Sequence, residues 1–316
     1  MIQQLNDFSS NAGDFKLALI KESNGDYLEF LSSLKPRYWR VWLDICGGYF
    51  ATIAVLFLSG HFESTPAVVV VLVGAILFGL AVQFLQLFIH EGAHFGLASN
   101  RRLNDVLCDF LISWQVGTTI KAYRAVHLAH HRMLGKREDS EISYTNRLSL
   151  GFILRALFGV HALNTAFQHG RESQRSQHST SALWSHLGGA LVHFLLLLLT
   201  YEWLGISAVL VYVFGMGVFF PFFASLRQLL EHRPETGYTP DEGSDAVTRN
   251  FEPGVISAIL GGAGFSKHLL HHWEPGLSYT NLAELEQHLK RTSVAAKILD
   301  MRQASYFRTF KHLWNV

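Results

Sequence analysis

Histidines gather in three short clusters along this 316-residue chain. The first cluster reads HEGAH, the second HLAHH and the third HLLHH, and one more histidine ends the stretch QLLEH. The clustered side chains are His90, His94, His127, His130, His131, His232, His268, His271 and His272. Imidazole is a borderline ligand that suits iron, zinc and copper. This number of imidazoles exceeds what one ion needs and fits two, so a two-metal site is the first hypothesis.

The spacing within each cluster is that of one helix face. Side chains three or four residues apart on a helix lie on the same side. Each cluster therefore brings two or three imidazoles into one volume. A lone histidine is more often a surface residue or a hydrogen-bonded core residue, so we expect none of the isolated ones to bind metal. These are His61, His161, His169, His178, His186, His193, His288 and His312.

The first cluster also matches HExxH, the signature of zinc metalloproteases. In that reading His90 and His94 bind zinc and Glu91 activates water. The motif explains only two of the clustered histidines, and no convincing third ligand follows it, so a membrane zinc protease is a distant alternative. Glu91 and His94 also form the ExxH of soluble di-iron bundles, but those proteins need a second such motif, which this sequence lacks.

The composition is that of a membrane protein with a sizeable polar part. Hydrophobic residues make up 49% of the chain and charged residues only 16%, and the mean hydropathy is +0.19. These values are too apolar for an ordinary soluble domain. The net charge of +1 gives no sign of a nucleic-acid partner, and we expect none. Cys46 and Cys108 form no disulfide pattern, and we expect both to be buried thiols.

Two long windows, residues 41–100 and 176–226, contain no Lys or Arg. Each window is long enough to cross a bilayer and return as a helical hairpin. The first predicts spans at about 43–59 and 67–89, and the second predicts spans at about 187–203 and 206–226 with a short turn near Gly205. At about 1.5 Å per residue, the span at 67–89 reaches about 34 Å, enough to cross. The expected fold is all-α: a four-span bundle of two hairpins with a helical cap that carries the histidines, forming one domain over residues 1–316.

The basic residues predict the orientation of these spans. All 26 lie outside the two windows and flank them, and basic loops face the cytoplasm. We therefore expect residues 1–40, 100–180 and 227–316, with both termini, on the cytoplasmic side of what we expect to be a bacterial inner membrane. Every clustered histidine then lies on that side.

With HEGAH, HLAHH and HLLHH in this order and spacing, the chain resembles the membrane fatty acid desaturase superfamily over about residues 43–273. That superfamily includes stearoyl-CoA desaturases, alkane monooxygenases and carotenoid ketolases. The resemblance implies two irons held by the clustered histidines, with His232 matching the extra histidine after the last span. Gln228 stands where stearoyl-CoA desaturases have an Asn that holds a metal-bound water. Glu91 and Asp139 are candidates to orient ligands without touching metal, although a surface role for Asp139 is equally compatible with the sequence.

The resemblance also implies the reaction class. We expect an O2-dependent enzyme that inserts a C=C bond into a fatty-acyl or lipid-like chain, with hydroxylation or ketone formation on an alkyl or isoprenoid substrate as the alternative. No catalytic side chain beyond the metal ligands is predicted. The sequence has no cysteine set for an iron–sulfur cluster and no HPGG motif of a fused heme domain. Electrons are therefore expected from a separate, ferredoxin-type protein, and the substrate from the bilayer. Lys121, Arg124 and Arg227 could bind an anionic headgroup or act as positive-inside anchors.

Overall fold

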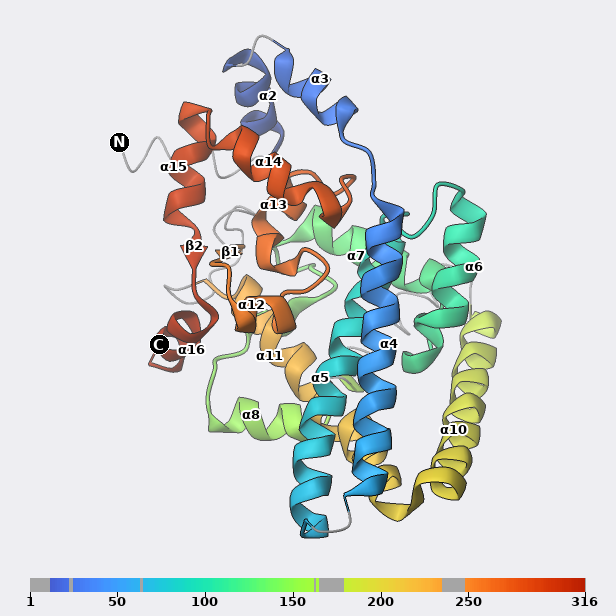
Figure 1. Ribbon diagram of the computed structural model, residues 1–316. Coiled ribbons are helices and arrows are strands. Elements are labelled where there is room, and N and C mark those ends of the chain that lie inside the picture. Colours follow the sequence, from blue (N-terminus) through green and yellow to red (C-terminus); the bar gives the residue numbers. More distant parts are fainter. Residues whose placement is uncertain are drawn as a thin grey trace. The chain divides into compact units, whose positions relative to one another are not determined.

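The computed structural model describes residues 12–22, 25–62, 65–161, 163–164, 179–234 and 248–315. Its regular structure is almost entirely helical there (Figure 1), with one parallel pair of very short strands. The chain divides into two compact units. Unit 1 comprises Met1–Arg40, Leu128–Leu148 and Gln228–Val316, and unit 2 comprises Val41–His127 and Ser149–Arg227. Each unit is described by itself below.

Unit 2 contains the long apolar helices. Its helical segments, three of which continue into unit 1, are α4 (Tyr38–His61), α5 (Ala67–Ala93), α6 (Arg101–Leu111), η1 (Ser113–Val116), α7 (Ile120–Met133), α8 (Leu150–Leu157), α10 (Ser179–Phe214), the π-helix η3 (Gly215–Phe219) and α11 (Phe220–His232). Large apolar side chains such as Phe50 and Trp203 are more than 70% exposed on these helices. A protein surface of this kind requires an apolar solvent, as a bilayer provides.

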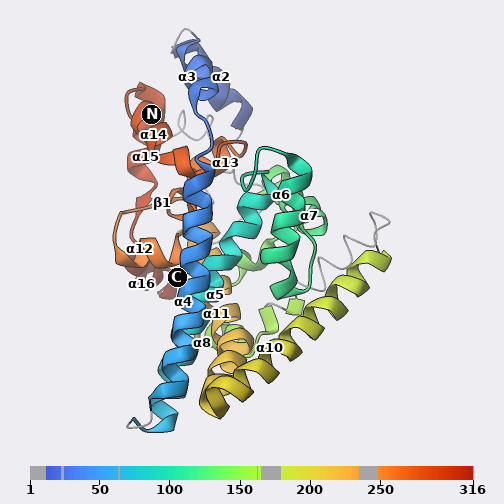
Figure 2. The same ribbon diagram turned by 45° about the vertical axis from the view of Figure 1, so that its right-hand side comes forward.

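Three helical stretches in the described residues are long and apolar enough to cross a membrane: Tyr38–His61, Ala67–Ala93 and Trp184–His232. The sequence predicted four spans. The last two, 187–203 and 206–226, lie in one helical stretch with no separate turn segment between them. Only Gly205 leaves the helical conformation, with φ 76° and ψ −175°, values that favour glycine. Figure 2 shows the chain turning sharply at the end of the first part of α10.

Glycines on α5 let its backbone approach the later helices of unit 2 closely. A Cβ atom at Gly79 would lie 2.5 Å from the Cβ of Phe219, and one at Gly74 would lie 2.7 Å from a methyl of Val211. Small residues serve this purpose in membrane helix packing, where van der Waals contact replaces the hydrophobic effect. A cluster of buried side chains completes the contact: Phe78, Val82, Val211 and Tyr212.

A polar seam fixes η1 against these helices. His193 bonds the hydroxyl of Tyr212 through Nδ1 (2.6 Å) and the carbonyl of Gln115 through Nε2 (2.9 Å). Gln86 donates to the Gln115 side chain (3.0 Å) and to the carbonyl of Ile112 (3.2 Å). Backbone groups that lack a helical partner must be satisfied in an apolar surrounding. The seam therefore explains why a short, irregular segment can lie among long apolar helices.

Unit 1 contains short helices around its own apolar core. They are α2 (Ala12–Glu22), α3 (Asp26–Ser33), η2 (Ile142–Thr145), α12 (Val255–Leu260), η4 (Phe265–Lys267), α13 (His268–Trp273), η5 (Tyr279–Asn281), α14 (Leu282–Leu289), α15 (Ser293–Met301) and α16 (Tyr306–Trp314). The strands β1 (Asn250–Phe251) and β2 (Gln303–Ala304) pair in parallel. The third histidine cluster, HLLHH, is amphipathic on α13, because Leu269 and Leu270 are fully buried in the apolar core while its histidines occupy the other positions.

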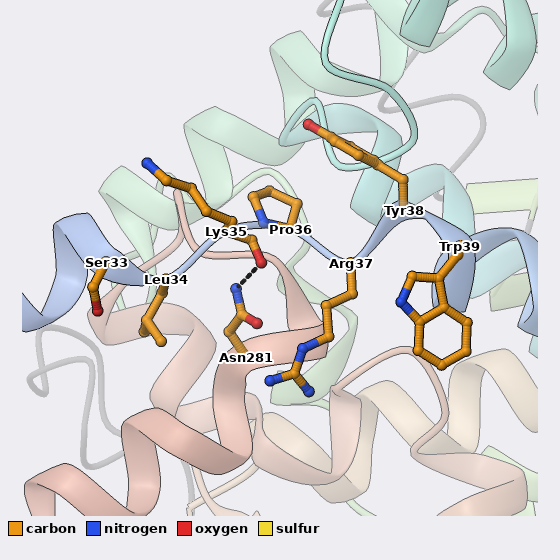
Figure 3. A pocket seen from close by; sticks show the side chains of 8 residues that line it. All are labelled: Ser33, Leu34, Lys35, Pro36, Arg37, Tyr38, Trp39 and Asn281. Atoms are coloured by element: carbon orange, nitrogen blue, oxygen red, sulfur yellow. Dashed lines mark hydrogen bonds between the residues drawn. The ribbon is translucent and has the colours of Figure 1, made fainter.

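The segment between α3 and α4 is held to the C-terminal helices of unit 1. It lines a pocket of about 550 Å³ with Asn281 (Figure 3). The amide of Asn281 donates to the carbonyl of Lys35 (3.0 Å), and Arg37 pairs with Glu284 on α14. These contacts anchor the N-terminal end of α4, the first apolar helix.

One smaller expectation was wrong. Cys46 is exposed on α4, whereas Cys108 is buried as predicted. The apolar face of α4 is turned outward over much of its length, which places Cys46 at the surface with Phe50 and Ile53. The C-terminal region forms three short helices, α14 to α16. Thr292 and Ser305 precede two of them in extended conformations and divide the region.

Candidate metal centre

Three of the clustered histidines belong to unit 2 and the other six to unit 1, and each set is described by itself. The three-histidine cluster of unit 2 consists of His90, His94 and His127. His90 lies in the last turn of α5, His94 follows directly at its C-terminal cap, and His127 is on α7. The Nε2 atoms of His94 and His127 are 2.9 Å apart, and the rings of His90 and His127 have centroids 4.4 Å apart. All three side chains offer nitrogen atoms within 4.8 Å of one another.

The six-histidine cluster of unit 1 consists of His130, His131, His232, His268, His271 and His272. The last residue of α11, His232, lies 2.8 Å from His268 between Nε2 atoms, and His268 lies 3.2 Å from His272. A further pair of Nε2 atoms, from His131 and His271, is 3.1 Å apart. The ring of His130 lies edge to face against those of His232 and His272. Histidines from α7, α11 and α13 thus share one volume.

The spacing of these nitrogens fits metal ligands. A metal–imidazole bond is about 2.1 Å, so two ligands at a right angle have nitrogens about 3 Å apart. The four Nε2 pairs span 2.8 to 3.2 Å. An all-nitrogen donor set suits iron, zinc or copper rather than magnesium or calcium, which prefer oxygen. Both clusters therefore fit a transition-metal ion of the kind the histidine motifs predicted.

Asp139 and Tyr144 form a hydrogen-bonded chain to His130 of the six-histidine cluster. The carboxylate of Asp139 bonds Nδ1 of His130 (2.8 Å) and accepts from the hydroxyl of Tyr144 (2.6 Å) and the backbone amide of Glu141 (2.8 Å). A carboxylate on one ring nitrogen fixes the tautomer and leaves the other nitrogen for a metal. Asp139 is itself only 4% exposed, so it is not the surface acid that the sequence left open.

Burial and neighbouring groups shift the pKa values of individual histidines in different directions. Burial, together with His127 and Arg124, lowers the pKa of His94 to about 3. Burial and four neighbouring histidines lower the pKa of His272 as well. Burial alone would lower the pKa of His130, but Glu141 and Asp139 outweigh it and raise that pKa. A ligand must be deprotonated at the metal, so the low values favour metal binding by His94 and His272.

Other residues singled out in the sequence contact protein groups. The side chain of Glu91 is buried and lies against Gly96, where a Cβ atom would come within 2.1 Å of Oε1. Gln228 donates its amide to Glu141 (3.0 Å). Burial raises the pKa of the Cys108 thiol to about 12. Arg124 was a candidate for headgroup binding, but its guanidinium is engaged by Asp105 and by two backbone carbonyls.

Sequence reasoning missed one buried acid. Glu231, the residue before His232, is fully buried, and its carboxylate lies within 4.8 Å of ligand nitrogens of His232 and His268. Tyr306 donates to it at 3.4 Å. The signal in the sequence was a glutamate at the end of an apolar run, next to a candidate ligand. It was passed over because a glutamate at such a position is usually solvent-exposed.

Comparison with known families identifies the family to which the chain belongs. The model of the fatty acid desaturase family matches residues 64–303, a range that includes all of the clustered histidines. The chain belongs to the fatty acid desaturase family. It is therefore an oxidoreductase from a family known for iron-dependent catalysis, and its apolar helices make it an integral membrane protein. The resemblance drawn from the histidine motifs is confirmed. A search of curated proteins found no significant match.

Proposed function

We propose that this desaturase-family protein is a membrane-bound, O2-dependent di-iron enzyme that inserts a C=C bond into a fatty-acyl or lipid-like chain. The observation that carries the proposal is the convergence of histidine Nε2 atoms to about 3 Å in both clusters. Ordinary surface or core histidines do not need such spacing, whereas ligands of a common ion do. In the proposal all of the clustered histidines bind two irons, and Asp139 orients His130.

The protein contributes ligands, orientation and exclusion of water. When bound, iron supplies the activation of O2 for attack on an unactivated C–H bond, which no amino-acid side chain performs. Removing two hydrogens from adjacent carbons consumes one O2, two electrons from the external donor and two protons, and yields two waters. His90, His127, His130, His232, His268 and His271 are all at most 5% exposed. Burial of this kind keeps competing water away from a reactive centre.

The proposal includes a four-span topology with both termini and the histidines on the cytoplasmic side. Its support is the absence of basic residues from 41–100 and 176–226, together with the break at Gly205, which divides Trp184–His232 into two segments of membrane length. A cysteine placed in 60–66 should then react with an impermeant thiol reagent added outside, once Cys46 and Cys108 are replaced. One placed at Ser305 should not.

The electrons are proposed to come from a ferredoxin-type partner. The two cysteines of the chain are too few to ligate an iron–sulfur cluster, and both are free. The substrate is proposed to arrive from the bilayer, because the apolar faces of α4 and α10 are exposed along their length. A bacterial inner membrane is the proposed location.

Two measurements test the function. Protein purified in mild detergent should contain two irons per chain, and metal content near zero after iron loading would contradict the proposal. Lipids from cells that express the protein should contain a product two hydrogens lighter than its precursor, dependent on O2 and absent with His232→Ala. A product heavier by one oxygen would instead identify a hydroxylase.

The zinc protease is not proposed. Family membership accounts for all of the clustered histidines, whereas the protease motif accounts for two. Glu91→Gln gives a direct check. In a desaturase this variant should leave the iron content largely intact. In a zinc protease, where Glu91 would activate water, it would abolish peptide cleavage.

A further inference from the structure

The C-terminal end of α5 has an unusual backbone. Phe95 adopts the left-handed conformation, with φ 62°, one residue after His94. The amide of Phe95 bonds the carbonyl of Gly92 (3.1 Å), and that of Gly96 bonds the carbonyl of Glu91 (2.9 Å). This is the Schellman pattern of helix termination, in which glycine ordinarily takes the left-handed position. A phenylalanine there costs conformational energy, so other contacts must hold it.

Two arginines provide those contacts. The guanidinium of Arg124 lies 3.9 Å from the centre of the Phe95 ring, and that of Arg101 lies 4.7 Å from it. Both are within the range of a cation–π interaction. Gly96 cannot exchange places with Phe95, because a side chain at position 96 would meet the carboxylate of Glu91.

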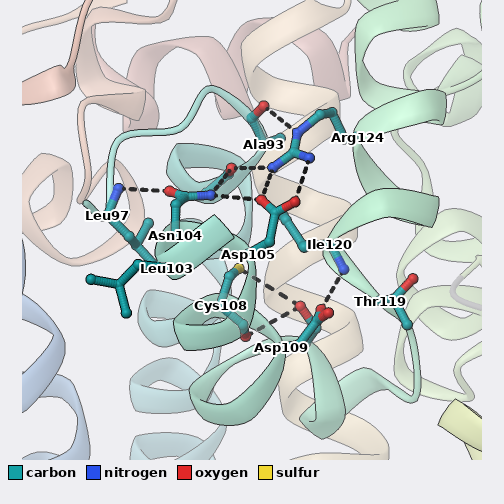
Figure 4. Close-up of polar contacts among 12 residues, drawn as sticks. Ala93, Leu97, Leu103, Asn104, Asp105, Cys108, Asp109, Thr119, Ile120 and Arg124 are labelled. Carbon is teal, nitrogen blue, oxygen red and sulfur yellow. Dashed lines mark hydrogen bonds and ion pairs between the residues drawn. The ribbon is translucent and has the colours of Figure 1, made fainter. Parts of the chain in front are cut away.

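Arg124 also binds the last carbonyls of α5 (Figure 4). Its Nε donates to the carbonyl of Ala93 (2.8 Å), and its Nη2 donates to that of Gly92 (3.0 Å). The carboxylate of Asp105 on α6 accepts hydrogen bonds from both terminal nitrogens of Arg124, at 2.5 and 3.2 Å. Asn104 adds a bond to the Gly92 carbonyl (2.9 Å). Burial alone would raise the pKa of Asp105, but the hydrogen bonds from Arg124 and Asn104 outweigh it and keep that pKa low.

The position of Arg124 gives these contacts a functional meaning. It lies three residues before His127 on α7, so the two side chains share a helix face. The carbonyls it binds belong to the residues between His90 and His94. One guanidinium therefore connects the helix of His127 to the turn that holds the other two members of the three-histidine cluster. A planar fork with five donors can make these bonds together, and a lysine ammonium cannot.

We propose that Arg124, with Asp105 and Phe95, forms a brace that sets the spacing of His90, His94 and His127 and hence the metal affinity of the three-histidine cluster. These are positioning residues, and none of them is proposed to contact the metal or the substrate. The inference rests on the proposed function, because it assigns a metal to that cluster.

The test uses metal-free full-length protein in mild detergent, titrated with Co²⁺ alone and analysed for bound metal per chain. In Arg124→Gln and Asp105→Asn, one class of Co²⁺ site should weaken about 10- to 100-fold, as is usual when an outer partner of a ligand is lost. The other class should keep its affinity. Arg124→Lys should recover only part of the loss. Lys121→Gln removes the same charge from an exposed position of α7 and should change neither class.

Two results would overturn the brace: unchanged affinity at both sites in Arg124→Gln and Asp105→Asn, or an equal loss at both, which a general weakening of the fold would cause. Amide hydrogen exchange over residues 92–97 gives a reading that needs no metal. It should accelerate at least tenfold in metal-free Arg124→Gln and remain at the wild-type rate in Lys121→Gln. If wild-type protein bound no Co²⁺ or Fe²⁺, the proposed function would fail, and unchanged exchange in Arg124→Gln would separately refute the brace.

Discussion

The two histidine clusters are held by opposite charges. In unit 2 a cation, Arg124, binds the backbone carbonyls next to His90 and His94. In unit 1 an anion, Asp139, binds the ring of His130 directly. The first arrangement fixes where the helix ends, and the second fixes how one imidazole is turned and which nitrogen it presents. Both leave ligand nitrogens about 3 Å apart.

The comparison shows why the supports are not interchangeable. A carboxylate on an imidazole favours the protonated ring, and indeed Glu141 and Asp139 raise the pKa of His130. A guanidinium placed near imidazoles disfavours protonation, and Arg124 contributes to the low pKa of His94. The guanidinium of Arg124 can therefore lie near the imidazoles only if other groups compensate its charge. Asp105 and the backbone carbonyls of Gly92 and Ala93 do so. The cost of burying its charge is offset by those bonds.

The largest effect is expected from removal of a ligand. His94→Ala in unit 2 and His232→Ala in unit 1 should each lower desaturation activity by more than about 100-fold, because losing an outer partner alone typically costs 10- to 100-fold. Under the proposed function wild type binds two Co²⁺ per chain, and each variant should bind close to one. His312→Ala, an exposed histidine of α16, is the matched control and should bind two. Full metal binding in either ligand variant would remove that cluster from the site.

The next effect separates the supports. Asp139→Asn should weaken one class of Co²⁺ site about 10- to 100-fold, and it should be the class that Arg124→Gln leaves intact. Tyr144→Phe removes one hydrogen bond to the same carboxylate and should cost less than about tenfold. The double variant Asp139→Asn/Arg124→Gln should then show additive losses, as independent sites do. If both single variants weakened the same class, the two clusters would not be separately supported.

Sequence reasoning anticipated which histidines would converge, because it depended only on local spacing. HxxxH and HxxHH fix a helix face within one or two turns, and the charge-free run of 67–89 fixes most of α5, which extends to Ala93 and so includes His90. The assignment to a desaturase family followed from the same motifs and is confirmed by the match over residues 64–303.

The supports could not be predicted in the same way, because they depend on contacts distant in sequence. Arg124 bonds residues 31 and 32 positions away, and no periodicity links them. Asp139 was recognised as a candidate but left undecided, because nothing in the sequence shows the loop folding back on Tyr144. The last two of the four predicted spans lie in one helical stretch that is broken at Gly205. A single glycine can end one helix and begin the next without a polar turn.

A smaller effect tests the packing around Glu91 in the first cluster. Gly96→Ala should lower the stability of the protein by about 1 to 3 kcal/mol, the usual cost of overpacking. The new Cβ atom would lie 2.1 Å from Oε1 of Glu91 and 2.6 Å from its Cγ, so the whole buried side chain must move. Thermal unfolding in detergent measures the change. Gly47→Ala on α4, where a Cβ atom meets nothing within 4 Å, should leave the melting temperature unchanged or slightly raised. Equal melting temperatures for both variants would show that Glu91 moves freely.

The smallest effect concerns the ion pairs of Glu286 next to α13, the helix that carries the third histidine cluster. Glu286 on α14 pairs with Lys267, the residue before α13, and with Lys290 (2.9 Å). Burial alone would raise the pKa of Glu286, but the two lysines outweigh it and lower that pKa. A carboxyl whose pKa is lowered on folding stabilises the protein fully at a pH above its unfolded-state pKa. This contribution is lost as the pH falls through the folded-state pKa. Glu286→Gln should therefore lower the melting temperature at pH 7 and converge with wild type near the acid end of the titration.

The expected loss for Glu286→Gln is below about 1 kcal/mol at pH 7, because partly exposed ion pairs contribute little. Leu269→Ala, which opens a cavity beneath the same helix, should cost about 2 to 5 kcal/mol at every pH. This contrast matters for the comparison of the clusters. If the charge variant cost as much as the core variant, α13 would be held by ions, as the end of α5 is, and the two regions would share one design. We expect the reverse, because α13 places two fully buried leucines, Leu269 and Leu270, into an apolar core, whereas the ion pair of Lys267 with Glu286 is partly exposed.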